Sequence, residues 1–470
     1  MDVRSRRERR FRAYDARTLD RIGPLAERLT PDERLELRAV AQVFPFRVND
    51  YVIEELIDWD RVPDDPIYRL TFPHRDMLSP DDLSDLVQLM SEGHEAETRA
   101  KARQIQTSLN PHPSGQLTHN VPLLDGVRMQ GMQHKYRETL LFFPAQGQTC
   151  HSYCTYCFRW PQFVGLDELK FANREAGQLV AYLRAHPEVT SVLFTGGDPL
   201  IMKTSVLRRY IEPLLSAELD QLTTIRLGTK SPAYWPYRFV TDDDADDLIR
   251  LFEDVRASGR HLALMAHISH PRELETPIAQ AAIRRVLGTG AVVRCQAPLV
   301  RHVNDDPKTW SDLWRLEVRL GAVPYYMFVE RDTGPRSYFE IPLVRTVEIF
   351  RDAYSSVSGL ARTVRGPSMS AMPGKVMIDG VAEVGGQKVF VLHFLQARDP
   401  DWVGRPFFAK LDETATWFDQ LHPAFESEFF FERRMDELGA GATGWHGRPE
   451  RRVAKLFRIV DDDFTTAAAG

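Results

Sequence analysis

Short apolar runs alternate with stretches of helical spacing through the middle of the chain. Six runs have the length and composition of buried strands, and they span residues 139–144, 190–194, 223–227, 261–266, 291–300 and 323–329. This alternation predicts βα units around a parallel sheet. Six units are too few for a complete eight-stranded barrel. We therefore expect an α/β fold with an open, partial (βα)6 barrel and a site at the C-terminal ends of its strands.

The chain before the barrel has helical patterns. Thr30-Pro31-Asp32-Glu33 is a capping box with proline at the first helical position, and Ser79-Pro80 precedes a second amphipathic stretch. Residues 109–127 are rich in turn-forming residues and are typical of a linker. We expect residues 1–127 to be a mainly helical region that ends in this linker.

Within and after the barrel, two further patterns bear on the organisation. Thr241 is followed by Asp242, Asp243 and Asp244, and this pattern predicts a helix that starts at Thr241. After about residue 357, residues 376–378 and 389–392 have the pattern of hairpin strands and precede helical segments with an Ala-rich end. We therefore expect the barrel over residues 128–357 and an α+β extension over residues 358–470.

Composition and charge argue against several classes of protein: nucleic-acid-binding, membrane-spanning and secreted. The 470 residues carry a net charge of −6, which argues against a nucleic-acid-binding face. No run of 18 apolar residues exists, so no transmembrane helix is expected. The basic first twelve residues include Asp2 and Glu8 and lack an apolar segment, so they predict a solvated helix or arm and not a secretory signal. Only four cysteines are present, which makes a disulfide framework improbable and a cytoplasmic location the expectation.

Three of the four cysteines, Cys150, Cys154 and Cys157, fall within eight positions. Three thiolates on one short loop can hold three irons of a 4Fe-4S cluster and leave the fourth iron open to a small chelating molecule. Two alternatives remain open. The same spacing would place three buried cysteines on one face of a helix. A zinc ion would need a fourth ligand, for which only His151, inside the triplet, is near in sequence.

The Cys-x3-Cys-x2-Cys spacing resembles the signature of the radical S-adenosylmethionine enzymes. The resemblance implies that the amino and carboxylate groups of S-adenosylmethionine chelate the open iron, and that an electron from the cluster cleaves it to a 5′-deoxyadenosyl radical. Gly196-Gly197-Asp198 follows the second predicted strand and resembles the segment of these enzymes that holds the amino group of S-adenosylmethionine. The alternative for Asp198 is that it only caps the next helix.

The resemblance narrows to the lysine 2,3-aminomutases and covers roughly residues 60–395. It is carried, in order along the chain, by Asp64-Asp65-Pro66-Ile67, His134-Lys135-Tyr136, Cys157-Phe158-Arg159, residues 226–232, His267-Ile268-Ser269-His270-Pro271, Gln296, Val303-Asn304-Asp305 and Val323-Pro324-Tyr325-Tyr326. The resemblance implies that His267 and Gln296 line the S-adenosylmethionine pocket. Their alternative role is as polar residues satisfied at strand ends.

The same family carries pyridoxal 5′-phosphate on a lysine after a glycine-rich turn, and Lys375 stands at that place after Pro373-Gly374. Nearby apolar residues would lower the pKa of this lysine. Lys135 and Tyr136 would contact the phosphate. Two departures weaken this expectation, because the family's run of glycines is reduced to one and a second family arginine aligns with Thr139. An ordinary exposed lysine is the alternative.

The resemblance also implies how an amino-acid substrate would be held. Arg159 matches the arginine that grips the α-carboxylate. The two aspartates that hold the side-chain ammonium of lysine align with Arg331 and Ser368, although a one-residue shift would restore Glu330 or Asp332. A guanidinium repels an ammonium and attracts a carboxylate, so lysine is an improbable substrate and an acidic side chain is favoured. Glutamate aminomutases also carry a cation at the first position.

We therefore expect a radical S-adenosylmethionine 2,3-aminomutase that moves an amino group from C2 to C3. One alternative keeps the cluster without pyridoxal phosphate and acts on another small molecule or a protein residue. Another is a non-enzymatic iron-sulfur protein for electron transfer or sensing, which would not require residues 196–198. The expected partners are an amino acid and an electron donor such as a flavodoxin or ferredoxin, with no nucleic acid or membrane. Assembly into a homo-oligomer is left open.

Overall fold

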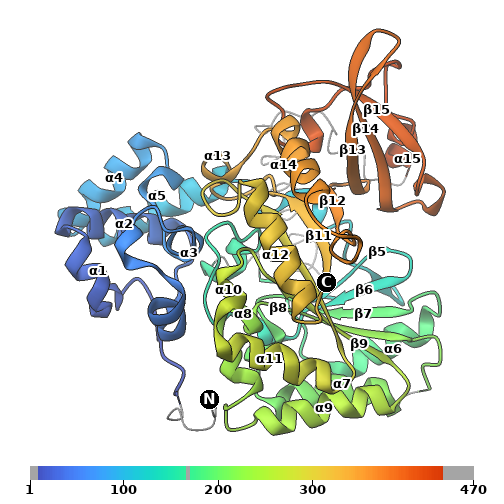
Figure 1. Cartoon of the computed structure of the whole chain (residues 1–470), viewed down its shortest axis with the longest axis horizontal. Coiled ribbons are helices and arrows are strands. Elements are labelled where there is room, and N and C mark those ends of the chain that lie inside the picture. The colour runs from blue at the N-terminus through green and yellow to red at the C-terminus, as the bar shows by residue number, and fades with distance from the viewer. Residues whose placement is uncertain (1–8, 166–169, 217, 438–470) are drawn as a thin grey trace, which may run out of the picture.

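One 11-stranded sheet organises the computed structural model of the chain, which describes residues 9–165, 170–216 and 218–437 (Figure 1). The six predicted strands lie side by side and parallel in the sheet. They are β6 (Thr139–Phe142), β7 (Ser191–Phe194), β8 (Thr224–Thr229), β9 (His261–His267), β10 (Val292–Leu299) and β11 (Val323–Val329). The predicted partial (βα)6 barrel is confirmed.

Helices follow the parallel strands and cover one face of the sheet (Figure 1). The longer ones are α6 (Ala176–Ala185), α7 (Thr204–Ser216), α9 (Ala245–Ala257), α11 (Pro277–Gly288), α12 (Pro307–Arg319) and α14 (Leu343–Ser355). Burial alternates along β10, where Val293 and Cys295 are buried but Arg294 and Gln296 are only half-buried. Since successive strand residues point to opposite faces, the half-buried face is the interior of the barrel, where the polar side chains lie.

Short helices complete the loops of the barrel, and one of the predicted helix starts is wrong. The short helices are α8 (Ser231–Tyr234), α10 (Arg272–Glu275) and α13 (Arg336–Phe339). Helix α9 begins at Ala245 and not at Thr241. The acidic residues before it are bound to other groups, because Asp242 accepts from the Trp235 indole and Asp244 pairs with Arg238.

The N-terminal region is helical, as expected, and lies to one side of the sheet (Figure 1). Its helices are α1 (Gly23–Arg28), α2 (Pro31–Val43), α3 (Pro66–Thr71), α4 (Pro80–Ser91) and α5 (Glu95–Ser108), and a small ladder pairs β1 (Ala13–Tyr14) with β2 (Val48–Asn49). Both predicted caps are confirmed: Thr30 and Glu33 form a reciprocal capping box, and the Ser79 hydroxyl accepts from the Asp82 amide at 3.1 Å. The prediction for the basic start falls mostly on residues 1–8, outside the described residues.

The C-terminal region continues the same sheet. Strand β12 (Arg365–Ser370) is parallel to β11, and β13 (Gly374–Val384), β14 (Gln387–Ala397) and β15 (Pro406–Lys410) follow in antiparallel order. The predicted hairpin is β13–β14, which turns at Gly385-Gly386, where both φ angles are positive. The sheet crosses residue 357 without a break, so the domain boundaries remain a prediction. Helix α15 (Glu432–Glu437) ends the described chain, and the Ala-rich end lies beyond it.

The predicted linker is irregular, but it packs over the mouth of the barrel. It contains the small hairpin of β3 (Leu123–Leu124) and β4 (Val127–Arg128), and it leads into β5 (Met132–Tyr136), the edge strand beside β6. The Gly334 amide donates to the Leu109 carbonyl at 3.0 Å, and the Asn110 amide nitrogen donates to Asp332. Across the described residues, no helix is both long and apolar enough to cross a membrane.

Candidate functional site

The three clustered cysteines lie on the loop that follows β6, and the N-terminal region clamps this loop. The Tyr153 amide donates to the Arg47 carbonyl at 2.8 Å, and the Thr155 amide donates to the Leu70 carbonyl at 3.0 Å. The side-chain amide of Asn49 donates to the Ser152 hydroxyl at 3.0 Å. The loop is therefore held from below by the strand and from the side by the helical region.

Cys150, Cys154 and Cys157 are free, half-buried thiols, and they are close enough to influence one another electrostatically. Burial, Asp198 and the two other thiols all raise the pKa of Cys150. Thiolates on one zinc ion would lie about 3.8 Å apart, given zinc–sulfur bonds of about 2.3 Å. In the described chain, the three sulfurs do not all lie within 4.8 Å of one another, so they are too far apart to bind a single zinc ion. Thiols that bind three different irons need the wider spacing.

His151 does not complete a zinc site. Its Nδ1 lies 3.2 Å from the Ser231 hydroxyl, and its ring packs edge-on against Phe11. Burial lowers the pKa of His151 to about 3, so the ring is neutral. The one close group of potential ligands in the described residues is His134, His186 and Glu188. Both His134 nitrogens already have partners, the Tyr182 hydroxyl and the Arg137 carbonyl, so this group holds β5 against α6.

The Gly196-Gly197 turn after β7 packs directly on the cysteine loop. A Cβ at Gly196 would lie 2.2 Å from the Gln148 side chain, and one at Gly197 would lie 2.3 Å from the Thr149 carbonyl oxygen. Gly196 also has a φ of 138°, which disfavours other residues. The Asp198 amide donates to the Thr149 carbonyl at 2.7 Å. The two glycines therefore bring the ends of the first two barrel strands together.

The Asp198 carboxylate lies beside the cysteine loop but is turned toward the end of β8. It accepts hydrogen bonds from the Thr229 hydroxyl at 2.8 Å and from the Lys230 amide at 2.9 Å. It also accepts from the Ser231 hydroxyl at 3.0 Å and, as a cap of η10 (Pro199–Ile201), from the Leu200 amide. These donors occupy both oxygens, so the carboxylate has little capacity left for an ammonium group. The alternative role as a cap is thus realised, and the backbone of Gly196 and Gly197 remains available.

His267 is the last residue of β9, and its backbone is paired with Gln296, in the second half of β10. The Tyr156 hydroxyl bridges the cysteine loop to His267 Nε2 at 2.8 Å. Burial and the neighbouring Lys230 hold the pKa of His267 well below its usual range, so the ring is neutral. The expected pocket residues are therefore brought to the cysteine loop by two adjacent strands.

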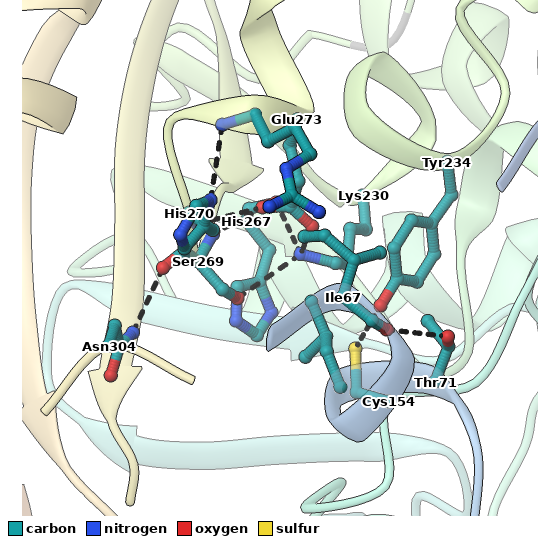
Figure 2. A network of polar contacts seen from close by, with 12 residues as sticks. Ile67, Thr71, Cys154, Lys230, Tyr234, His267, Ser269, His270, Glu273 and Asn304 are labelled. Carbon is teal, nitrogen blue, oxygen red and sulfur yellow. Dashed lines mark hydrogen bonds and ion pairs between the residues drawn. The ribbon is translucent and has the colours of Figure 1, made fainter. Parts of the chain in front are cut away.

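A buried ion pair supports this part of the site. Lys230 Nζ lies 2.7 Å from a Glu273 carboxylate oxygen and donates to the Ser269 hydroxyl at 3.2 Å (Figure 2). Figure 2 also shows Tyr234 reaching the Cys154 sulfur, at 3.3 Å. No sequence pattern predicts a role for Lys230 or Glu273. Lys230 lies within a segment of the resemblance, but the sequence holds no sign of its partner 43 residues later.

Lys375 lies at the start of β13 and reaches into the barrel. Its Nζ is 4.2 Å from the centre of the Tyr326 ring and 5.6 Å from that of Phe328. Burial, followed by the positive charges of Arg226 and Arg365, lowers the pKa of Lys375 to about 7. This is the environment that a lysine needs to attack an aldehyde at neutral pH, so the residues present fit pyridoxal phosphate. The apolar residues near Lys375 in the sequence predict its low pKa, but no sequence pattern predicts the two arginines.

The expected phosphate contacts lie near Lys375 but are differently arranged. Lys135 Nζ donates to the Ala371 carbonyl. Burial and the neighbouring cations Arg398, Arg331 and Lys375 hold the pKa of Lys135 well below its usual range. Tyr136 is half-buried on the same strand, and its pKa is raised by burial. Lys135 is therefore poorly suited to supply a positive charge.

Arg159 and Arg331 lie near the same aromatic ring. Their guanidinium carbons lie 4.9 Å and 5.3 Å from the centre of the Phe158 ring. Arg159 is buried, and its Nη1 has no hydrogen-bond partner within the described part of the protein. Arg331 also lies 5.5 Å from the centre of the Trp417 ring, which comes from the C-terminal region. Two guanidinium groups thus lie near one ring beside the cysteine loop.

The two acidic residues next to Arg331 differ in their surroundings. Asp332 is bound by the Asn110 side chain at 3.1 Å and lies 3.8 Å from Arg331. Glu330 is buried, and burial holds its pKa well above the usual range, which favours the neutral acid. Ser368 lies on β12 opposite Phe328, fully buried, and its hydroxyl has no partner in the described chain.

Comparisons with known proteins agree with this geometry, although no family model matches the chain. An Aquifex aeolicus (strain VF5) protein with the provisional name L-lysine 2,3-aminomutase is 32% identical over 84% of this chain and 92% of its own. The L-lysine 2,3-aminomutase of Haemophilus influenzae is 30% identical over 50% of this chain and 66% of its own.

Among solved structures, a radical S-adenosylmethionine methyltransferase, TsrM from Kitasatospora setae, aligns with 41% of this chain and 37% of its own at 13% identity. Its TM-score is 0.27, too low to carry an argument. The Aquifex relative is matched over nearly its whole length, in a segment that includes the cysteine loop, the barrel and the hairpin of Lys375. The chain is an enzyme and belongs to the lysine 2,3-aminomutase family of radical S-adenosylmethionine enzymes.

Proposed function

We propose that the protein is a pyridoxal phosphate-dependent 2,3-aminomutase whose substrate is an α-amino acid with an acidic side chain. The proposal is carried by one observation, that the guanidinium groups of Arg159 and Arg331 both lie close to the Phe158 ring. Two guanidinium groups close to one ring favour a ligand with two carboxylates. Lysine would bring an ammonium group close to these cations and would be repelled.

Arg159 is the group that we assign to the α-carboxylate. A buried guanidinium nitrogen without a partner is costly, and a carboxylate would satisfy it in a charge-assisted hydrogen bond. The ring stacking against Phe158 and Phe143 fixes the plane of the guanidinium, so the approaching carboxylate meets it in a defined orientation. The same position beside Cys157 would keep the substrate close to the cluster.

Arg331 and Ser368 are assigned to the side-chain carboxylate. The buried Ser368 hydroxyl has no partner and can donate to a carboxylate oxygen. Asp332 offsets part of the charge of Arg331, but Glu330 does not, since its burial favours the neutral form.

The family implies a 4Fe-4S cluster and S-adenosylmethionine, and we assign the three irons to Cys150, Cys154 and Cys157. S-adenosylmethionine, when bound at the fourth iron, supplies a radical that takes a hydrogen atom, and pyridoxal phosphate on Lys375 supplies electron delocalisation. The neutral His267 and Gln296 would line the adenosyl side of this pocket. Trp417 and the linker at Asn110 cover the mouth of the barrel and would exclude water.

The test is an assay of reduced enzyme with S-adenosylmethionine and pyridoxal phosphate against each amino acid in turn. Mass spectrometry after derivatisation separates each β-amino acid from its α-isomer. We expect turnover of glutamate or aspartate and none of lysine. An Arg331→Asp variant should lose the acidic substrate and accept lysine better. The substitution replaces a positive charge by a negative one where the side chain of the substrate would bind.

The matched control is Arg351→Asp, since Arg351 lies on the exposed face of α14 and pairs only with Asp352 among the described residues. Its substrate preference should equal that of the wild type. Turnover of lysine alone by the wild-type enzyme would contradict the assignment of Arg331. Cleavage of S-adenosylmethionine with no cofactor attached to Lys375 would instead favour a radical enzyme without pyridoxal phosphate, acting on another small molecule or a protein residue.

A further inference from the structure

A cavity of about 370 Å³ lies inside the barrel at the N-terminal ends of its strands, opposite the end that carries the cysteine loop. The first residues of β6, β7 and β8 line it, and these are Thr139, Ser191 and Thr224. Three arginines on β8, β10 and β12 also line it, Arg226, Arg294 and Arg365. None of the described lining residues is acidic. The cavity therefore collects three positive charges without an opposing carboxylate in its wall.

The three arginines are held in place by aromatic and polar neighbours. The guanidinium carbons of Arg294 and Arg365 lie 5.1 and 4.5 Å from the centre of the Tyr325 ring. Arg226 Nη2 donates to the Thr139 hydroxyl at 3.3 Å. The Nε of Arg226 and the Ser191 hydroxyl are buried and have no hydrogen-bond partner in the described chain. Like charges that converge around unsatisfied donors create a strong preference for an anion.

Lys375 does not line this cavity, but it shares a neighbouring ring with Arg365, which does. Lys375 Nζ and the Arg365 guanidinium lie over the same Tyr326 ring, at 4.2 and 4.5 Å from its centre. In pyridoxal phosphate, the phosphate arm and the aldehyde stand on neighbouring ring carbons. A lysine that holds this cofactor therefore needs its phosphate site close by, within the same part of the barrel.

We propose that this cavity binds the phosphate monoester of the cofactor on Lys375, with Arg226, Arg294 and Arg365 as its cations. The inference rests on the proposed function and names a site that the sequence did not predict. Thr139 stands where the family places an arginine, and the guanidinium of Arg226 is hydrogen-bonded to that threonine. The positive charge is thus supplied from β8, β10 and β12 instead of β6. Lys135 is instead occupied by the Ala371 carbonyl, to which its Nζ donates.

The test compares the binding of pyridoxal phosphate and of pyridoxal, which lacks the phosphate, to the protein freed of cofactor. Absorbance of the bound chromophore gives both affinities, and borohydride reduction with peptide mapping verifies attachment at Lys375. The wild type should prefer pyridoxal phosphate. Arg294→Met and Arg365→Met should each lower that preference about tenfold to hundredfold, as expected for the loss of a charge-assisted contact, and leave pyridoxal binding nearly unchanged.

Two controls separate charge from folding. Arg294→Lys keeps the charge and should retain most of the preference, whereas Arg351→Met changes an exposed arginine and should have no effect. Inorganic phosphate should compete with pyridoxal phosphate but not with pyridoxal in the wild type, and this competition should weaken in Arg365→Met. These measurements do not depend on turnover.

The outcomes distinguish this inference from the proposed function. If wild-type Lys375 is labelled and the arginine variants keep the full preference while Lys135→Met loses it, the phosphate lies elsewhere. The inference is then wrong and the proposed function stands. If wild-type Lys375 takes up neither compound, the proposed function fails and this inference fails with it.

Discussion

In the protein without cofactor, the Lys375 amine should titrate near neutral pH. Burial and the nearby charges of Arg226 and Arg365 lower its pKa to about 7, so about half of the amine is neutral at pH 7. An ordinary lysine with a pKa of about 10.4 is neutral in only about one molecule in 2,500 at that pH. The neutral, nucleophilic fraction of Lys375 is therefore about a thousandfold larger.

Arg226→Met tests the electrostatic part of this effect. Burial is the larger cause, so the loss of one cation should raise the pKa by roughly half a unit to one unit. A rise of one unit would reduce the neutral fraction at pH 7 from a half to about one in eleven. The direction is fixed, because a removed positive neighbour always makes the protonated amine more favourable.

The assay is arylation of the cofactor-free protein by an uncharged amine-selective reagent, quantified by peptide mapping at pH values from 5.5 to 10. The labelling rate at Lys375 should reach half its maximum near pH 7 in the wild type and at higher pH in Arg226→Met. Arg351→Met should leave the midpoint unchanged. A wild-type midpoint at or above pH 9 would refute the assignment of Lys375 to an apolar, cationic environment.

Three further variants test other parts of the structure. Cys154→Ala should lose most of its iron by elemental analysis, whereas Cys295→Ala, which changes a buried residue of β10 far from the cysteine loop in sequence, should keep it. Gly197→Ala should lower both the melting temperature and the iron content, because its Cβ would meet the backbone of that loop at 2.3 Å. Gly177→Ala, with open space around it, should lower neither. Thr30→Ala should reduce the free energy of unfolding by about 1 kcal/mol in denaturant titrations, through loss of the capping box.

The local pattern of apolar, polar and turn-forming residues was sufficient to predict the parts of the fold that depend on neighbours in sequence. The six barrel strands, both helix caps and the hairpin of Lys375 follow from periodicity and turn residues, and the structure contains them. Strand β12 was not predicted because Arg365-Gly366-Pro367-Ser368 does not alternate between apolar and polar residues. It also contains a glycine and a proline, both of which disfavour strands. Its place in the sheet depends on pairing with β11 and β13.

The parts of the site that were missed depend on contacts between distant segments. Asn110 reaches Asp332 across 222 positions, so a segment that looked like a linker covers the mouth of the barrel. The cavity lined by Arg226, Arg294 and Arg365 is assembled from residues on seven strands, and no local sequence motif predicts it. Asp198 was correctly placed near the cysteines by its motif, but the direction of its carboxylate is set by Thr229 and Ser231 on the next strand.

The cysteine loop and Lys375 lie on strands far apart in the chain, and their order in the sequence sets the order in which they become available during synthesis. Cys157 leaves the ribosome 218 residues before Lys375. At about 5 to 20 residues per second, the cysteine loop waits roughly 10 to 40 s before the strand that carries the lysine exists. During that interval the barrel lacks β12 and β13, and its interior is open along that edge. A cluster bound by this loop would therefore have an open edge to enter by in the nascent chain, whereas a cofactor on Lys375 could attach only after that residue has been made.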